Sequence, residues 1–208
     1  MPDDFRTFDV KQDGEGVAAQ IKETIDVLLA ESFKELACQQ PIEKITIKEI
    51  TDKAGVIRPT FYNHFQDKYE LLEWIIKKQI LEPIRPLVLA GMIDEGLMLM
   101  FTTIEKERDF YEKAVRLEGQ NSFESIVKKC IEETLLEVLT LKKGTGNKRK
   151  ERRYPWLTPE NMAEFYAQAM CFVIVSWIER EMDVTPRELT DIYNYIMTTP
   201  MHEVLEEL

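Results

Sequence analysis

Apolar residues recur at steps of three and four positions over most of the chain, the spacing of one face of an α-helix. From Val17 to about Gln39 such a stripe predicts one helix, and its apolar positions are Ile21, Ile25, Leu28, Leu29, Phe33 and Leu36. No alternation of apolar and polar residues is long enough to predict a β-strand. The pattern therefore predicts an all-α protein.

The segment from Thr46 to Phe65 predicts two short helices joined by a tight turn. Gly55 stands where the chain must reverse, and glycine tolerates the positive φ that such a turn often needs. Pro59 suits the first turn of the second helix because its fixed φ is helical and its missing N–H costs nothing there. Two helices joined in this way form the unit with which many proteins place a recognition helix in the major groove of DNA.

Capping signals and buried faces support these helices. Thr46 with Glu49 matches a T-x-x-E capping box, and Asp67 with Glu70 repeats the arrangement for the helix that follows. The positions expected to face inward are Ile47, Ile50 and Ala54 in the first helix and Phe61 and Phe65 in the second.

A further helix is predicted from about Asp67 to Ile80, and its wide apolar arc indicates burial on two sides, as in a connector. Pro83 and Pro86 then interrupt the helical pattern, which places a domain boundary there. The expected organisation is a disordered acidic tail at 1–14, a three-helix DNA-binding domain with its connector at 15–82, and a C-terminal helical effector-binding and dimerisation domain at 83–208.

The C-terminal part has five further helical patterns, at about 92–106, 108–118, 122–141, 159–182 and 186–197. Their expected end signals are Gly119, Ser122, Thr158-Pro159, and Thr185-Pro186 with Glu188. Seven basic residues lie between Lys142 and Arg153. This run predicts a solvated, mobile loop, and a secondary contact with DNA or a partner is the alternative.

Composition fits a globular protein, with 44% hydrophobic and 31% charged residues. No apolar stretch reaches the length of a membrane span, and the N-terminus lacks the order of a signal peptide, so a cytoplasmic location is expected. Cys38, Cys130 and Cys171 are expected to be free thiols. The net charge of −11 is unevenly placed, because the segment 44–80 is nearly neutral. A few cationic side chains near the DNA are enough to bind its phosphates, although the whole chain is acidic. The acidic rest of the chain either limits non-specific DNA binding or only confers solubility.

One set of residues resembles the DNA-binding segment of the TetR family of transcriptional regulators: Ile50, Ala54-Gly55-Val56, Thr60-Phe61-Tyr62, His64-Phe65, Lys68 and Leu71-Leu72. Ile57 departs from the small polar residue common after the Gly-Val pair, so the capping of the recognition helix is expected to differ. The second part is similar, less specifically, to TetR-type ligand-binding domains. FYNHFQDKYELLEWI followed by LEPI, and FVIVSWIEREMDVTPRELTDI, resemble the dihydroxyacetone-kinase-regulator type.

The resemblance implies a homodimer on a palindromic double-stranded DNA operator. With Phe61 and Phe65 inward, Asn63 points nearly opposite on the helix, and Pro59, Thr60 and Tyr62 lie beside it, so these positions can contact DNA. The resemblance implies phosphate contacts for Thr60, Tyr62, His64 and Lys68. Arg58 and Asn63 are expected to reach base edges, and Lys48 either backbone or base. The alternative for His64 is a structural imidazole.

The resemblance also implies control by a small-molecule effector or partner protein, without saying whether binding to DNA represses or activates. The effector pocket is expected to lie beside the connector helix, and Trp74 and Phe110 are the first candidates for its lining. The wider set is Met92, Met98, Met100, Phe101, Phe110, Tyr111, Phe165, Tyr166 and Met170. The alternative for each is an ordinary core position.

The helix at 159–182 carries more apolar surface than one core face needs, which predicts a two-fold, four-helix dimer interface with the following helix. Its residues are Phe165, Met170, Phe172, Val173, Val175, Trp177 and Ile178, joined by Ile192, Tyr195 and Ile196. The alternative is burial within one chain's own core.

Other function classes find less support. His64 and His202 are the only histidines, the cysteines lack metal-site spacing, and there is no glycine loop that could cradle a phosphate. No enzyme activity, metal or cofactor is therefore expected. A helical interaction protein that kept the fold and lost DNA binding is the remaining alternative.

Overall fold

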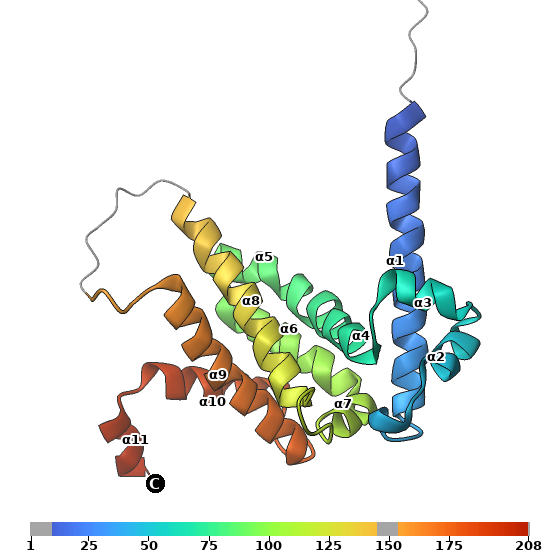
Figure 1. Ribbon diagram of the computed structural model, residues 1–208. Coiled ribbons are helices and arrows are strands. Elements are labelled where there is room, and N and C mark those ends of the chain that lie inside the picture. The colour runs from blue at the N-terminus through green and yellow to red at the C-terminus, as the bar shows by residue number, and fades with distance from the viewer. Residues whose placement is uncertain (1–9, 145–153, 208) are drawn as a thin grey trace, which may run out of the picture.

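The computed structural model describes residues 10–144 and 154–207 of the chain. Every regular element in these two ranges is helical, which confirms the predicted all-α class (Figure 1). The elements are α1 (Val10–Ala37), the short 3-10 helix η1 (Ile42–Lys44), α2 (Ile47–Ala54), α3 (Arg58–His64), α4 (Lys68–Ile75), the π-helical segment η2 (Ile76–Leu81), α5 (Glu82–Ala90), α6 (Ile93–Lys106), α7 (Arg108–Ala114), α8 (Phe123–Gly144), α9 (Pro159–Glu179), α10 (Pro186–Thr198) and α11 (Met201–Glu207).

The predicted DNA-binding domain, here called the head, consists of α1, α2 and α3, which lie together at one end of the molecule (Figure 1). The predicted capping box is confirmed, because the Thr46 hydroxyl accepts from the Glu49 N–H and the Glu49 carboxylate accepts from the Thr46 N–H. Gly55 adopts φ 71°, the left-handed conformation predicted for the turn. The capping box at the start of α2 and the left-handed Gly55 at its end therefore determine the orientation of α3 relative to α2.

The cap of α4 differs from the prediction in one detail. The Asp67 carboxylate accepts from the N–H groups of Tyr69 and Glu70, as an N-cap does. The Glu70 carboxylate, however, reaches back to the N–H of Gln66 and not to that of Asp67.

Helix α1 is longer than predicted and less apolar in its packing. It begins at Val10, so residues 10–14 belong to a helix and not to a disordered tail, and the rest of that predicted tail lies outside the described residues. Leu29 and Phe33 are fully buried, whereas Ile21 and Leu28 are 56% and 46% exposed. The helix contacts α2, α3, α4 and α7, and these two side chains lie on the part of its surface that no helix covers.

The predicted helix break at Pro83 and Pro86 is wrong, because α4, η2 and α5 follow one another without a loop from Lys68 to Ala90. In η2 the backbone bonds skip to the fifth residue back, as from the Glu82 N–H to the Lys77 carbonyl. The regular series of α-helical backbone hydrogen bonds is therefore already interrupted just before Pro83, which has no N–H to donate. Pro83 and Pro86 are both exposed, so their rings lie on the solvent side of the helix. The connector therefore passes from the head straight into the second domain.

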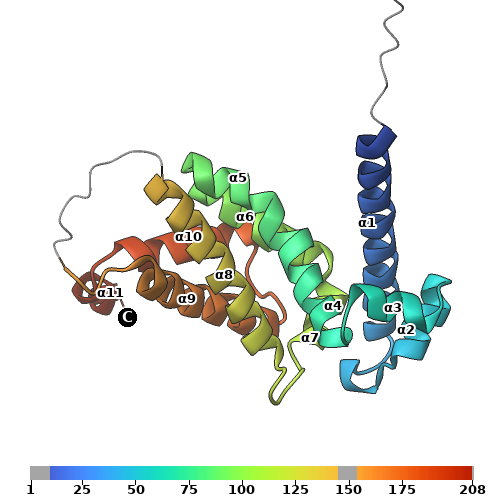
Figure 2. The ribbon, with the colours of Figure 1, turned by 45° about the horizontal axis from the view of Figure 1, so that its top comes forward.

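Helices α5 to α10 form the second domain, in which α8 and α9 pack lengthwise and α6 contacts both α5 and α10 (Figure 2). Thr158 and Thr185 cap the N-termini of α9 and α10 as predicted, and Thr185 does so with a full capping box. Gly119 has φ 86°, and the Ser122 hydroxyl accepts from the Ser125 N–H. Helix α11 was not predicted. Within the described ranges, no helix combines the length and the apolar character needed to cross a bilayer.

The two domains meet at a buried cation on α1. The Lys34 ammonium lies 2.7 Å from carboxylate oxygens of both Glu31 and Glu107 and donates to the Gln79 side-chain oxygen at 3.0 Å. Beside it, Phe33 of α1 meets Phe110 of α7 edge to face, with ring centroids 6.2 Å apart. Three segments, α1, η2 and the turn before α7, are therefore joined at one point.

Candidate functional site

The orientation of α3 agrees with the prediction from its sequence. Phe61 and Phe65 are buried, while Arg58, Tyr62 and Asn63 lie exposed on the opposite side. Pro59 is also exposed, and Thr60 is half-buried. The face that carries the predicted base contacts is thus open to solvent along the whole of this short helix.

Two cations border this face. The Arg58 guanidinium lies 3.2 Å from the Tyr62 hydroxyl and 5.8 Å from the centre of its ring, so Tyr62 holds the guanidinium over α3. Lys48 pairs with Asp52 one turn further along α2, and both side chains are largely exposed. Such a surface pair contributes about 0–1 kcal/mol, so Lys48 can exchange Asp52 for a phosphate at little cost.

The start of α3 has the unusual cap that Ile57 suggested. Ile57 is extended and makes no side-chain cap, and its own side chain is exposed. The helix start is held by backbone alone, through the Thr60 N–H and the Ile57 carbonyl at 2.9 Å.

His64 is turned toward the protein. Its Nδ1 lies 2.6 Å from an Asp26 carboxylate oxygen of α1, and the two side chains are only 9% and 12% exposed. A carboxylate accepts, so this nitrogen donates. The geometry favours the structural alternative, in which His64 ties α3 to α1.

The phosphate contact predicted for Lys68 conflicts with the structure. An ammonium has three N–H donors, and the Lys68 Nζ lies within 2.7–2.9 Å of the carbonyl oxygens of Ile42, Glu43 and Ile45. Partial burial lowers the pKa of Lys68 below its usual value. Sequence reasoning missed this role because the carbonyls lie more than twenty residues earlier in the chain.

Replacing Lys68 by methionine is therefore expected to lower the free energy of unfolding by about 1–3 kcal/mol, since three carbonyls lose a charged donor. Lys48→Met, in the same domain, is the matched control and should change stability by less than about 1 kcal/mol. Urea unfolding measures both. A Lys68→Met protein of unchanged stability whose DNA affinity depends less steeply on salt would restore the predicted phosphate contact.

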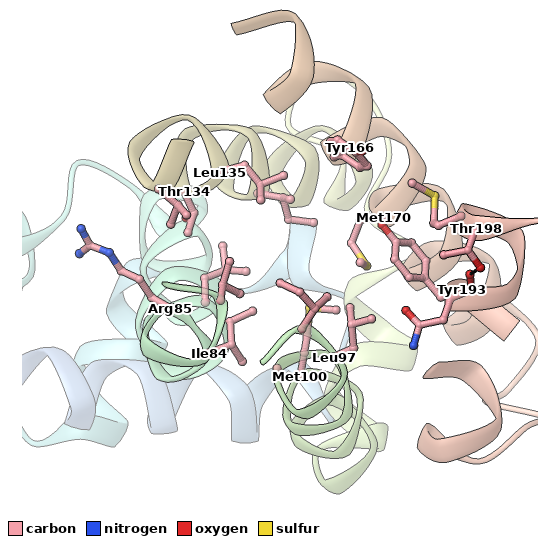
Figure 3. A pocket seen from close by; sticks show the side chains of 18 residues that line it. Ile84, Arg85, Leu97, Met100, Thr134, Leu135, Tyr166, Met170, Tyr193 and Thr198 are labelled. Carbon is pink, nitrogen blue, oxygen red and sulfur yellow. Dashed lines mark hydrogen bonds between the residues drawn. The ribbon is translucent and has the colours of Figure 1, made fainter. Parts of the chain in front are cut away.

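The second domain encloses a cavity of about 460 Å³ beside the connector (Figure 3). Ile84 and Val88 of α5, Leu97 and Met100 of α6, Leu135 of α8 and Met170 of α9 form its apolar wall. Tyr166 of α9 and Tyr193 and Thr198 of α10 bring polar groups to one end. Asn194 of α10 also lines the cavity. The position agrees with the prediction that an effector pocket lies beside the connector.

Neither of the first candidates for the pocket lining, Trp74 and Phe110, lines this cavity. Trp74 packs edge to face on Phe65, with ring centroids 6.1 Å apart, and so belongs to the contact between connector and head. Phe110 is buried between Phe33 and Tyr111. Of the wider set, Met100, Tyr166 and Met170 line the cavity. Aliphatic residues make up most of the wall, and sequence spacing cannot separate them from ordinary core.

An apolar surface on α9 and α10, the α9/α10 face, remains exposed in the single chain. It consists of Phe165, Phe172, Ile192, Tyr195 and Ile196, of which Phe172 is the most exposed at 68%. Met170, Trp177 and Ile178, also predicted for the interface, are buried in this chain's own core. Val173 and Val175 are partly buried against that core.

Comparisons with known proteins agree with this geometry. Residues 92–199 match the family model described as "Transcriptional regulator C-terminal region", and residues 32–75 match "Bacterial regulatory proteins, tetR family". The chain is 25% identical over 179 residues, 85% of its length and 89% of the relative's, to the HTH-type dhaKLM operon transcriptional activator DhaS of Lactococcus lactis subsp. lactis (strain IL1403). It is 40% identical over 60 residues to the uncharacterized HTH-type transcriptional regulator YxbF of Bacillus subtilis (strain 168), which is 29% of this chain and 16% of that protein.

Two solved structures share the fold. The dihydroxyacetone kinase operon activator DhaS superposes with a TM-score of 0.58 at 22% identity, covering 83% of this chain and 93% of that one. NalD, the secondary repressor of the MexAB-OprM multidrug efflux pump in Pseudomonas aeruginosa, gives 0.51 at 17% identity, covering 84% and 95%.

Proposed function

This chain belongs to the TetR family of transcriptional regulators, and we propose that it acts as a cytoplasmic homodimer that binds a palindromic operator and is controlled by a small molecule in the α5–α10 cavity. The observation that carries the proposal is the exposed face of α3, with Arg58 and Asn63 outward and Phe61 buried beneath them. Regulators of this type bind DNA operators and typically act as dimers. Two such heads can occupy two half-sites of one operator.

The contacts at the domain junction support control from the cavity. Leu81, the last residue of η2, lines the cavity, and Gln79 in the same segment accepts from Lys34 of α1. A molecule that favours one position of η2 therefore also acts on the helix that carries the head. An effector changes DNA affinity only through its different affinity for the two states, and a π-helical segment is a place where helices often adjust.

The target genes are suggested by the Lactococcus relative. Its name refers to the dhaKLM operon, and the match spans 85% of this chain. We therefore propose genes for dihydroxyacetone phosphorylation as a first candidate target. Binding of the purified protein to DNA upstream of its own gene and upstream of such genes, against scrambled DNA of equal length, tests both the regulator and the target.

Arg58→Ala is expected to weaken binding to the true operator by about 1–3 kcal/mol and to relax the preference at one base pair, because arginine reads guanine with two hydrogen bonds. Lys53→Ala is the control, since Lys53 pairs with Glu35 away from the exposed face of α3. Fluorescence anisotropy on operator and scrambled DNA at several salt concentrations measures the effect. Equal weakening on both DNAs would make Arg58 a phosphate contact.

A further inference from the structure

We propose that the cavity binds an uncharged, largely apolar molecule whose carbonyl or other neutral acceptor receives a hydrogen bond from Tyr193. The inference rests on the proposed role of the cavity as the effector site, and it adds the chemical class of the effector. Three features of the cavity support it: the wall, the pairing of nearby charges, and one hydroxyl that faces the cavity.

The wall selects for apolar surface. Ile84, Leu97, Met100 and Leu135 present only hydrocarbon and thioether groups, and their side chains converge on the open space in Figure 3. Val88 adds another aliphatic side chain to the same wall. The cavity volume of about 460 Å³ lies within the range of roughly 300–1,000 Å³ that small-molecule sites show. A ligand that leaves this wall in contact with water gains little from entering.

Charged groups at the cavity are already paired. Arg85 lines the cavity, but its Nη2 lies 2.6 Å from a Glu137 carboxylate oxygen and its guanidinium points away from the centre (Figure 3). The Nε of Arg85 is buried without a hydrogen-bond partner in the described part of the chain, so it is a spare donor whose charge Glu137 offsets. At the other end, the Asn194 amide, which lines the cavity, donates at 3.0 Å to Asp94, a carboxylate outside the lining. An ionic ligand would therefore enter without a free counter-charge.

The third feature is the hydroxyl of Tyr193. The residue is 8% exposed, its ring lies beside Met170 with the hydroxyl directed into the cavity, and the described residues supply no hydrogen-bond partner for it (Figure 3). Burial, with the nearby Tyr166 phenol, raises the pKa of Tyr193 to about 12, so the group stays a neutral donor. Thr198 is not available as a donor to a ligand, because its hydroxyl already donates to the Asn194 carbonyl at 2.7 Å. A donor that faces the cavity without a partner is free to donate to an acceptor on a ligand.

The same chemistry disfavours a small polyhydroxy compound. Dihydroxyacetone carries two hydroxyls and a carbonyl on three carbons, and it would lose most of its hydration against an aliphatic wall with few polar partners. If the regulated genes do act on dihydroxyacetone, the molecule sensed in this cavity is a different one.

Displacement of the neutral dye Nile red from the full-length protein tests the ligand class. The probes are octan-2-one, octanoate, octylamine and octane, which share a chain length and differ in charge and acceptor, with dihydroxyacetone as a fifth. We expect octan-2-one to bind at least about tenfold more tightly than either ion or dihydroxyacetone. Tyr193→Phe should weaken octan-2-one about two- to tenfold, the range for one neutral hydrogen bond, and leave octane unchanged. Tyr69→Phe, the same exchange outside the cavity, should alter neither.

Three results would overturn the inference. They are octanoate or octylamine binding as tightly as the ketone, equal ketone affinity in Tyr193→Phe and the unaltered protein, and displacement that persists when Leu97→Trp fills the cavity. Circular dichroism of the variants ensures that each result comes from folded protein. Operator binding without any probe is measured in parallel. Lost probe selectivity with intact operator binding overturns only the ligand class, whereas absent operator binding overturns the proposed function.

Discussion

Replacing Phe172 and Ile196 together by glutamate is expected to convert the dimer to monomers and to lower operator affinity by about 10²–10⁴-fold. Both side chains are exposed on the α9/α10 face, at 68% and 56%. In a two-fold interface each would meet the partner's copy of the same surface, so the double variant brings four unpaired carboxylates together in a buried region. Operator affinity falls because the second head no longer binds at the high effective concentration that the dimer provides.

Analytical ultracentrifugation and anisotropy on a two-half-site operator measure the two effects. The control carries the same two charges at Leu89 of α5 and Met92 in the turn before α6, which are exposed apolar residues on other elements than α9 and α10; it should remain a dimer and bind DNA normally. A Phe172→Glu/Ile196→Glu protein that stays dimeric would place the interface elsewhere. A monomer with unchanged operator affinity would remove the need for a dimer.

The parts of the fold predicted correctly depend on signals within a few residues of one another. The capping box at Thr46 and Glu49, the left-handed Gly55, and the inward Phe61 with the outward Asn63 each follow from helix geometry over one or two turns. Such rules hold before any tertiary contact is known. They were enough to predict the helix-turn-helix and the side of α3 that faces solvent.

The predictions that differ from the structure concern residues whose surroundings depend on a part of the chain distant in sequence or on altered helix geometry. Periodicity shows that Trp74 and Phe110 are apolar but not what covers them, and the structure places both in contacts with Phe65 and Phe33, away from the cavity. The donors of Lys68 are taken by carbonyls of residues 42–45. The π-helical bonds of η2 let the helix continue through prolines that normally end one.

His64→Ala is expected to lower the free energy of unfolding by about 3 kcal/mol, because it removes a contact within the head and not a contact with DNA. His64 and Asp26 are both about nine-tenths buried, and their 2.6 Å contact joins α3 to α1. Removing the imidazole leaves the Asp26 carboxylate buried without its donor, and breaking a buried pair on one side is among the most destabilising single changes.

A double-variant cycle separates this role from the predicted phosphate contact. Asp26→Ala is the matched partner, because it breaks the same contact from α1 without altering α3. If the pair is structural, each single variant has a lower free energy of unfolding in urea. The loss in the double variant is smaller than the sum of the two single losses, by at least about 1 kcal/mol, because the contact can be lost only once. A phosphate role for His64 predicts the opposite pattern: unchanged unfolding in His64→Ala, weaker binding to every DNA sequence, and no effect of Asp26→Ala on DNA affinity. The short contact to Asp26 leads us to expect the first pattern, with α3 held in place for reading DNA by a side chain that does not itself bind it.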